Sequence, residues 1–290
     1  MSDKISYQGV PGAYSHLACL RHYPALQPLA CESFEEAFSM VATGKAIKAM
    51  IPVENTLAGR VADIHYLLPS SNLEIAAEKF LPIQHQLLAK KGAKLTEIKR
   101  AHSHIMALGQ CRLSLKELNI KPVHANDTAG AAQICAQASS LQDAAVASQL
   151  AGEIYGLEVL AANIEDATHN TTRFLVMRQQ QQPTARQADM AYMTSFVFEV
   201  KNLPGALYKV MGGFATNGIN MTKLESYQLG GSFTATRFFC DIVGHPEQAN
   251  VAQALEEAGF FCKHLRMVGT YLADPFRQPK ATQTTGNFDD

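Results

Sequence analysis

Short apolar runs alternate with helix-period patterns along the first part of the chain. The run 5–8 predicts a strand, and the segment 14–21 after it predicts a helix. A second helix is predicted from Phe34 to near Gly44, because Ser33 and Glu36 form an S-x-x-E capping box before an apolar face. A sheet with helices packed on it is therefore expected at the start of the chain.

The same alternation continues to residue 178. The run 49–55 is typical of a buried strand, and a helical pattern through Val61, Ile64 and Leu68 follows it. An α/β domain is the fold class that this order favours. Further segments follow at 81–89, 101–109, 128–138, 144–148 and 172–177, of which 128–138 is helical.

Two polar segments interrupt the pattern. Residues 178–190, RQQQQPTARQADM, carry Gln repeats and a Pro and present no hydrophobic face, which is typical of a linker. The tail 273–290 lacks apolar periodicity and is expected to be disordered. The expected organisation is a domain over 1–178, a linker over 179–190, a second domain over 191–272, and the tail.

The segment 191–272 predicts a unit of another kind. Strands are expected at 195–200, 219–227, 233–243 and 262–271. Helices are expected at 205–216 and at 246–257, the second opened by Pro246. The order βαββαβ indicates a ferredoxin-like unit.

Charge and cysteine usage narrow the classes of function. With 25 Lys+Arg against 26 Asp+Glu the net charge is −1, so the broad basic field of a nucleic-acid-binding protein is missing. No run of about 18 apolar residues and no targeting pattern occur, so neither a membrane partner nor export is indicated and a cytoplasmic location is expected. The six cysteines are scattered without a CxxC pair, which indicates reduced core residues rather than disulfides or a metal site.

At three places a predicted strand end leads to a small hydroxyl residue at a predicted helix start: Ser15, Thr56 and Thr128. Helix N-termini expose unpaired N–H groups and partial positive charge, so three that converge would form a pocket for carboxylates or phosphates. The alternative is that the three hydroxyls only cap their helices.

Other candidates for chemistry have structural alternatives. Arg173 stands among apolar residues and needs an anionic partner, which is either a substrate carboxylate or an internal Asp or Glu. His102 and His104 could share one face of a strand, yet no Cys or carboxylate supports a metal site at that spacing. Cys111 follows an apolar segment and is more typical of a core residue than of a nucleophile.

Six ordered motifs resemble one family. The segments YQGVPGAYSHLAC, IPVENTLAGRV and LPIQHQLLA are similar to the first three motifs of prephenate dehydratases. SHIMALGQC, NDTAGAA and NIEDATHNTTRFLVM resemble their later motifs, including the Asn-x-Thr-Arg-Phe signature. The second part, with NLPGALYKVMGGFATNGINMTKLES, resembles the regulatory ACT domain that usually follows.

The resemblance implies a fold and a reaction. The catalytic part would have two α/β lobes like a type 2 periplasmic binding protein, with the active site between them. The chain would cross between the lobes near Asn72 to Ala77 and return after Asn163. The reaction would be the conversion of prephenate to phenylpyruvate, with loss of water and carbon dioxide and without a metal or other cofactor.

The motifs also imply site residues. Thr172 would hydrogen-bond the departing hydroxyl, and Arg173 would bind a substrate carboxylate. Glu54 and His85 are the titratable candidates near them, with no preference between the two. Glu54 can also have a purely structural role. The implied catalytic set is Thr172, Arg173, Glu54 and Asn55; the implied substrate-binding set is Ser15, Tyr14, Thr56, His85, Gln110, Thr128 and Phe174.

The ACT resemblance implies L-phenylalanine as allosteric effector and a homodimer or homotetramer. The chain departs from the family at Ile105-Met106, where Pro-Gln is usual, and at Tyr227-Gln228, where Arg-Pro is usual. An arogenate dehydratase and a non-catalytic cytoplasmic amino-acid sensor remain as alternatives. The implied effector residues are Asn202, Pro204, Gly205, Ala206, Leu207, Glu225 and Ser226.

Overall fold

The protein divides into two compact units. The computed structural model describes residues 3–61, 66–181, 185–229 and 232–277. The first unit comprises Met1–Pro183 together with Tyr227–Thr234, and the second comprises Thr184–Ser226 and Ala235–Asp290. Within the described residues, no helix has both the length and the apolar character needed to cross a bilayer.

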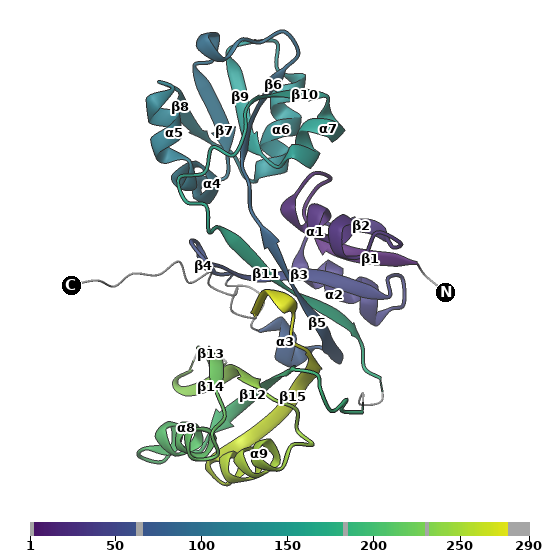
Figure 1. The fold of residues 1–290 in the computed structure, drawn as a ribbon, viewed down its shortest axis with the longest axis vertical. Helices are drawn as coiled ribbons and strands as arrows, with labels where there is room; N and C mark the ends of the chain where they lie inside the picture. Colours follow the sequence, from purple (N-terminus) through teal and green to yellow (C-terminus); the bar gives the residue numbers. More distant parts are fainter. Residues whose placement is uncertain (1–2, 62–65, 182–184, 230–231, 278–290) are drawn as a thin grey trace, which may run out of the picture. The chain divides into compact units, whose positions relative to one another are not determined.

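The first lobe of the first unit is built on a sheet of strand order β2-β1-β3-β11-β5, with β4 paired to β3 (Figure 1). β1 lies parallel to β2 and β3, whereas β11 runs antiparallel to β3 and β5. The core joins Ile5 and Tyr7 of β1 to Phe174 and Val176 of β11. The bounds are β1 Lys4–Gln8, α1 Tyr14–His22, β2 Gln27–Cys31, α2 Phe34–Ala42, β3 Lys48–Asn55, β4 Gly59–Arg60, α3 Leu67–Ser70, β5 Leu73–Pro82 and β11 Thr171–Gln179.

The second lobe has its own sheet, of order β10-β6-β9-β7-β8. Its core packs Leu87, Ala101 and Val146 of the sheet against Leu108 and Leu115 of the helices. The bounds are β6 Gln86–Lys90, η2 Leu95–Glu97, β7 Arg100–Ser103, α4 Ile105–Gln110, α5 Arg112–Glu117, β8 Lys121–His124, α6 Thr128–Gln137, β9 Asp143–Ala147, α7 Gln149–Tyr155 and β10 Leu157–Ala161.

Two segments connect the lobes, 83–85 on the way out and 162–170 on the return. The return agrees with the expectation after Asn163. The outward crossing expected at Asn72 to Ala77 is wrong, because Leu73–Pro82 form β5, whose buried residues pair with β11 in the first lobe. The two connections are hydrogen-bonded to each other through Ile83 N to Asn170 O at 2.9 Å and Ile164 N to His85 O at 2.9 Å.

The local signals at α2 act as predicted, with one change. Ser33 caps the helix by accepting a hydrogen bond from Glu36 N at 3.1 Å. The Glu36 carboxylate, however, accepts from Glu32 N at 2.7 Å rather than from the cap residue. The sequence motif therefore satisfies two amide donors, one of them a residue earlier than in a standard capping box.

The helix expected after β3 is wrong. The chain turns directly from β3 into β4, so Val61 lies after a short hairpin, and the next helix among the described residues is the single turn α3. Ile64 lies outside the described residues, and Leu68 is buried in α3.

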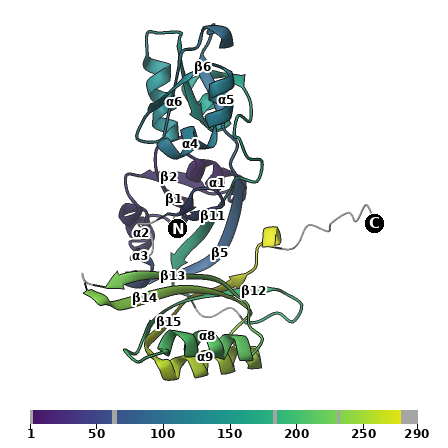
Figure 2. The same cartoon turned by 90° about the vertical axis from the view of Figure 1, so that its left-hand side faces the viewer.

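The second unit has the predicted order βαββαβ, confirmed by β12 Tyr192–Val200, α8 Ala206–Thr216, β13 Met221–Leu229, β14 Ser232–Val243, α9 Ala249–Phe261 and β15 Cys262–Leu272. The sheet order is β13-β14-β12-β15, with α8 and α9 on one face (Figure 2). Phe196 and Phe214 stack in the core between them, with ring centroids 5.5 Å apart.

α9 begins at Ala249, three residues after the proline that was expected to open it. Pro246 instead lies in a turn, which Gln248 N closes by donating to His245 O at 2.9 Å. Proline suits such a turn because its fixed φ matches the first central position.

The polar segments lie at the unit ends. β11 stops at Gln179 and β12 starts at Tyr192, and the described residues between them form neither helix nor strand. Of the tail, residues 278–290 lie outside the described part, while Pro275–Arg277 form a short 3-10 helix, so the expectation of disorder is wrong for those three residues.

Candidate active site

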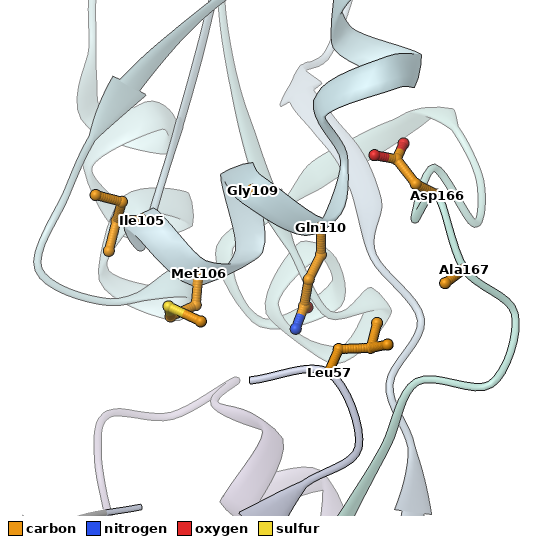
Figure 3. Close-up of a pocket in the computed structure, with 7 residues that line it drawn as sticks. All are labelled: Leu57, Ile105, Met106, Gly109, Gln110, Asp166 and Ala167. Carbon is orange, nitrogen blue, oxygen red and sulfur yellow. The ribbon is translucent and has the colours of Figure 1, made fainter. Parts of the chain in front are cut away.

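A hollow of about 340 Å³ lies where the two lobes of the first unit meet. The first lobe contributes Leu57 from the β3–β4 turn. The second lobe contributes α4, whose Gln110 side chain points toward Leu57 (Figure 3). The complete lining is Leu57, Ile105, Met106, Gly109, Gln110, Asp166 and Ala167.

Thr172 and Asn55 are neighbours on adjacent strands beside this junction. They face each other in the β11–β3 register, and Asn55 Nδ2 lies 2.9 Å from Thr172 Oγ1. Asn55 Oδ1 accepts hydrogen bonds from Leu57 N at 2.9 Å and Ala58 N at 2.8 Å, which fixes the amide nitrogen as the end that faces Thr172. Thr172 Oγ1 is therefore an acceptor toward Asn55, and its own proton has no acceptor among the described residues.

A chain of hydrogen bonds continues from Asn55 into the second lobe. Asn55 Nδ2 donates to Asn170 Oδ1 at 2.8 Å, and Asn170 Nδ2 donates to Gln110 Oε1 at 2.9 Å. Gln110 Oε1 lies 2.8 Å from His85 Nε2, and His85 Nδ1 lies 2.8 Å from the Tyr14 hydroxyl. Predicted residues from four motifs, Tyr14, Asn55, His85 and Gln110, thus belong to one network with Thr172.

Burial disfavours the charged form of His85. Its side chain is buried, and this burial lowers the pKa of the imidazole, against smaller opposing effects of Gln110 and Glu165. Burial raises the pKa of the Tyr14 phenol well above its usual value, so the phenol stays protonated. The shifts at both residues therefore favour neutral side chains in the hydrogen-bond chain from Tyr14 to Gln110.

Arg173 has internal carboxylate partners. Its Nε donates to Glu78 Oε2 at 2.8 Å and its Nη1 to Glu54 Oε1 at 2.9 Å. The Arg173 side chain is 3% exposed and that of Glu78 is fully buried, whereas that of Glu54 is 34% exposed. The sequence left either a substrate carboxylate or an internal acid as the partner of Arg173, and the structure has internal acids. Glu54 is the member of this cluster that reaches solvent.

Two of the three expected helix starts come together. Ala13, two residues before Ser15, and Ala129, the residue after Thr128, belong to one packed cluster. Gly12 lets the loop before α1 approach α7 closely, since a Cβ there would lie 2.9 Å from Ala151 Cα. Neither hydroxyl caps its helix: α1 has no side-chain cap, and Asp127 caps α6.

Thr56 corrects the third expectation. It follows β3 in a turn and not at a helix start. Its Oγ1 donates to His169 O at 2.8 Å and accepts from Thr171 N at 3.0 Å. Its hydroxyl therefore ties the β3–β4 turn to the start of β11.

Phe174 is also misplaced by the motif analysis. Its ring is 1% exposed and packs in the core of the first lobe with residues of β1 and β5. A substrate in the hollow cannot contact a ring that the lobe encloses, so its role is structural.

Other candidates have internal roles. His102 Nε2 lies 3.2 Å from Asp143 Oδ1, and His104 caps α4 through Met106 N, so the two imidazoles serve different elements. No cluster suited to a metal ion occurs within the described residues. Cys111 is buried and its thiol pKa is raised by burial, which is the behaviour of a core residue.

Sequence reasoning missed three contributors. Asn170 lies in the Asn-x-Thr-Arg-Phe signature, so the signal was present but was assigned no role. Glu78 carried no signal because β5 was not anticipated as a strand beside β11. Glu165, whose carboxylate accepts from His85 N at 2.8 Å, comes from the return connection, which has no periodic pattern.

The expected effector residues lie in the second unit. Gly205 has φ +74° and is the N-cap of α8, a conformation that favours glycine. Asn202 and Pro204 are exposed before it, Ala206 and Leu207 form the first turn of α8, Glu225 Oε1 accepts from Lys223 Nζ at 2.7 Å, and Ser226 is exposed on β13.

Known proteins share these features. The prephenate dehydratase sequence profile matches residues 5–182. A bifunctional N-acyl-homoserine lactone acylase/prephenate dehydratase of Komagataeibacter europaeus is 47% identical over 94% of this chain and 97% of its own. Arogenate dehydratase/prephenate dehydratase 1 of Arabidopsis thaliana is 36% identical over 94% of this chain and 73% of its own.

A solved structure extends the likeness to the fold. Prephenate dehydratase from Arthrobacter aurescens, in complex with L-Phe, superposes with a TM-score of 0.86 at 29% identity, over 95% of this chain and 91% of its own. Because the profile spans more than half of the chain and includes every residue of the network from Tyr14 to Thr172, the chain belongs to the prephenate dehydratase family.

Proposed function

We propose that this protein converts prephenate to phenylpyruvate, water and carbon dioxide as a step of L-phenylalanine biosynthesis. The observation that carries the proposal is the Thr172 hydroxyl, which accepts from Asn55 Nδ2 at 2.9 Å and so keeps its proton for another acceptor. A hydroxyl that leaves the substrate ring is such an acceptor. The family membership gives the reaction class, and the direction of the Asn55–Thr172 hydrogen bond gives a residue suited to that reaction.

The reaction needs electrons to move in one direction. As the ring carboxylate leaves as carbon dioxide, the electron pair of its C–C bond enters the ring, and the C–O bond breaks as the ring becomes aromatic. The departing oxygen takes that electron pair and must gain a proton to become water. A threonine hydroxyl is a weak acid, so Thr172 positions or relays this proton and stabilises the developing charge.

The charged cluster would serve binding and orientation. Arg173, Glu54 and Glu78 join β11, β3 and β5, and the partly exposed Glu54 is a candidate to exchange its bond to Arg173 for one to substrate. We propose substrate contacts for Ser15 and Thr128, near the two helix starts that come together, and for Gln110, which lines the hollow.

The finer assignments are proposals as well. The first unit would act as two lobes like a type 2 periplasmic binding protein, and residues 191–272 as an ACT domain in a cytoplasmic homodimer or homotetramer. The Arthrobacter aurescens relative was solved with L-Phe, which supports L-phenylalanine as effector here. Arogenate, which carries an amino group where prephenate has a keto group, is the alternative substrate, since the Arabidopsis relative is named for both dehydratase activities.

Turnover assays test the proposal. Purified full-length protein should form phenylpyruvate from prephenate, also in excess chelator, and parallel assays with arogenate measure the preference. An N-acyl-homoserine lactone assay covers the other activity named for the Komagataeibacter relative. Absence of turnover with both ring substrates would leave the amino-acid sensor as the better interpretation, and activity that chelator abolishes and a divalent ion restores would refute the mechanism.

A further inference from the structure

We propose that Asn170 is a positioning residue that decides which end of the Gln110 amide faces the hollow between the lobes. Asn170 is 1% exposed and lies on the return connection, between a residue of each lobe. It contacts Asn55 and Gln110 but is not among the residues that line the hollow.

The orientation starts from the backbone. Leu57 N and Ala58 N can only donate, so the oxygen of the Asn55 amide must face them. Its nitrogen then faces Asn170, and the Asn170 oxygen must accept. This leaves the Asn170 nitrogen as the donor at its other end.

The orientation passes through Asn170 to Gln110. Because Asn170 Nδ2 donates, Gln110 must present its oxygen, at 2.9 Å. The same oxygen lies 2.8 Å from His85 Nε2, which therefore carries the proton of the neutral ring. His85 Nδ1 is then the acceptor for the Tyr14 hydroxyl at 2.8 Å.

The consequence for the site is a pair of donors. With its oxygen engaged, Gln110 turns its NH₂ group away from the network, and this nitrogen has no acceptor within the described residues. The Thr172 hydroxyl likewise keeps its proton, because its oxygen accepts from Asn55 Nδ2. On the proposed function, both groups suit a substrate with two carboxylates and a departing hydroxyl.

A single isosteric change reverses the polarity. In Asn170→Asp the new carboxylate still accepts from Asn55 but repels Gln110 Oε1, so the Gln110 amide should turn over. Its nitrogen then faces His85 Nε2, and the imidazole must move its proton to Nδ1. Tyr14 can adapt, because its hydroxyl also lies 3.0 Å from Gln84 O and can donate there.

The test reads the His85 tautomer by imidazole ¹⁵N NMR of the full chain at mildly alkaline pH, with the signal assigned by its loss in His85→Gln. Wild-type protein should show the Nε2–H tautomer and Asn170→Asp the Nδ1–H tautomer, with kcat about 10² lower and little change in KM. Asn163→Asp is the matched control on the same connection. It contacts Gln86 and should change neither the tautomer nor kcat.

A second variant covers the case that Asn170→Asp does not fold. Gln110→Glu keeps an acceptor toward Asn170 and His85 but removes the donor, so it should retain the Nε2–H tautomer while kcat falls. An Nδ1–H tautomer in the wild type or in Gln110→Glu, or an unchanged tautomer in folded Asn170→Asp, would overturn the proposal. The tautomer is read without substrate, so an inactive wild type would refute the proposed function and still leave this test decisive.

Discussion

Asn55 Nδ2 donates to Thr172 Oγ1 across the β3–β11 pair at 2.9 Å, while the other end of the same amide is held by two backbone N–H groups. The side chain cannot turn over without losing both of these bonds. The direction of the hydrogen bond to Thr172 is therefore set by backbone groups of the β3–β4 turn, which do not themselves contact the hydroxyl that the proposed reaction uses.

Replacement of Thr172 by Val should lower kcat for prephenate by about 10² or more with little change in KM, because the hydroxyl is needed mainly as charge develops on the leaving oxygen. Thr172→Ser keeps the donor and is the control, with kcat within about tenfold of the wild type. Steady-state kinetics measure both. Equal activity of the Val and Ser variants would assign Thr172 a structural role at the start of β11.

Arg173→Lys keeps the charge at this position but loses the planar fork that reaches Glu54 and Glu78 together. If Arg173 also orients substrate through Glu54, KM should rise about tenfold or more while kcat changes less. Arg178→Lys is the matched control, since Arg178 of β11 pairs with Glu74 of β5, the same two strands that the Arg173–Glu78 pair joins. A KM equal to that of the control would limit Arg173 to the internal ion pairs.

The buried pair also predicts a stability effect. Glu78→Gln removes the fully buried one of the two carboxylate partners of a guanidinium that is 3% exposed, so the free energy of unfolding should fall by about 3 kcal/mol in urea denaturation. Glu97→Gln is the control, because Glu97 and Lys94 form an exposed pair and its loss should cost less than about 1 kcal/mol. A similar, small effect of both changes would mean that water reaches Arg173 in solution.

How far the sequence led can be judged from particular residues. The helix of Ser33 and Glu36 and the strand of β12 were predictable, since caps and alternation act over a few residues. β5 was not, because its pattern of buried positions only makes sense beside β11, about a hundred residues later. Because β5 was not predicted, Glu78 was not recognised as a partner of Arg173.

The site shows the same division. The motifs brought Tyr14, Asn55, His85, Gln110 and Thr172 together, and the structure joins them by hydrogen bonds. Which atom donates in each of those bonds depends on two backbone amides in the β3–β4 turn, and the sequence motifs do not show this. Phe174 was misassigned because a signature residue beside a functional one can serve only the core.

Stability should depend on the protonation of His85. Burial lowers the pKa of the folded imidazole from 6.5, so the unfolded chain takes up a proton at higher pH than the native chain does. As pH falls below about 6.5 the unfolded state gains protons first, and the free energy of unfolding decreases until pH passes the lower, native pKa. Urea denaturation between about pH 8 and pH 5 should give a shallower decrease in His85→Gln, and His264→Gln, at an exposed position, should match the wild type. Equal slopes in all three proteins would show that His85 does not contribute.

The last prediction concerns the effector. L-Phenylalanine should bind the full chain in calorimetry and lower prephenate turnover, and Gly205→Ala should weaken both effects. Gly205 has φ +74° with open space around a Cβ position, so the substitution strains only the backbone, by about 1 kcal/mol. Gly205→Asn tolerates this conformation better and should lie between Ala and wild type. Because the helix start offers N–H groups to an amino-acid carboxylate, a shift in this backbone should reach the ligand directly.

Tyr227-Gln228, in place of the usual Arg-Pro, can alter the coupling separately, since allostery requires only that the effector bind two states differently. Binding without inhibition would therefore show an intact but uncoupled site, whereas no binding to the wild-type chain would refute the assignment of L-phenylalanine as effector.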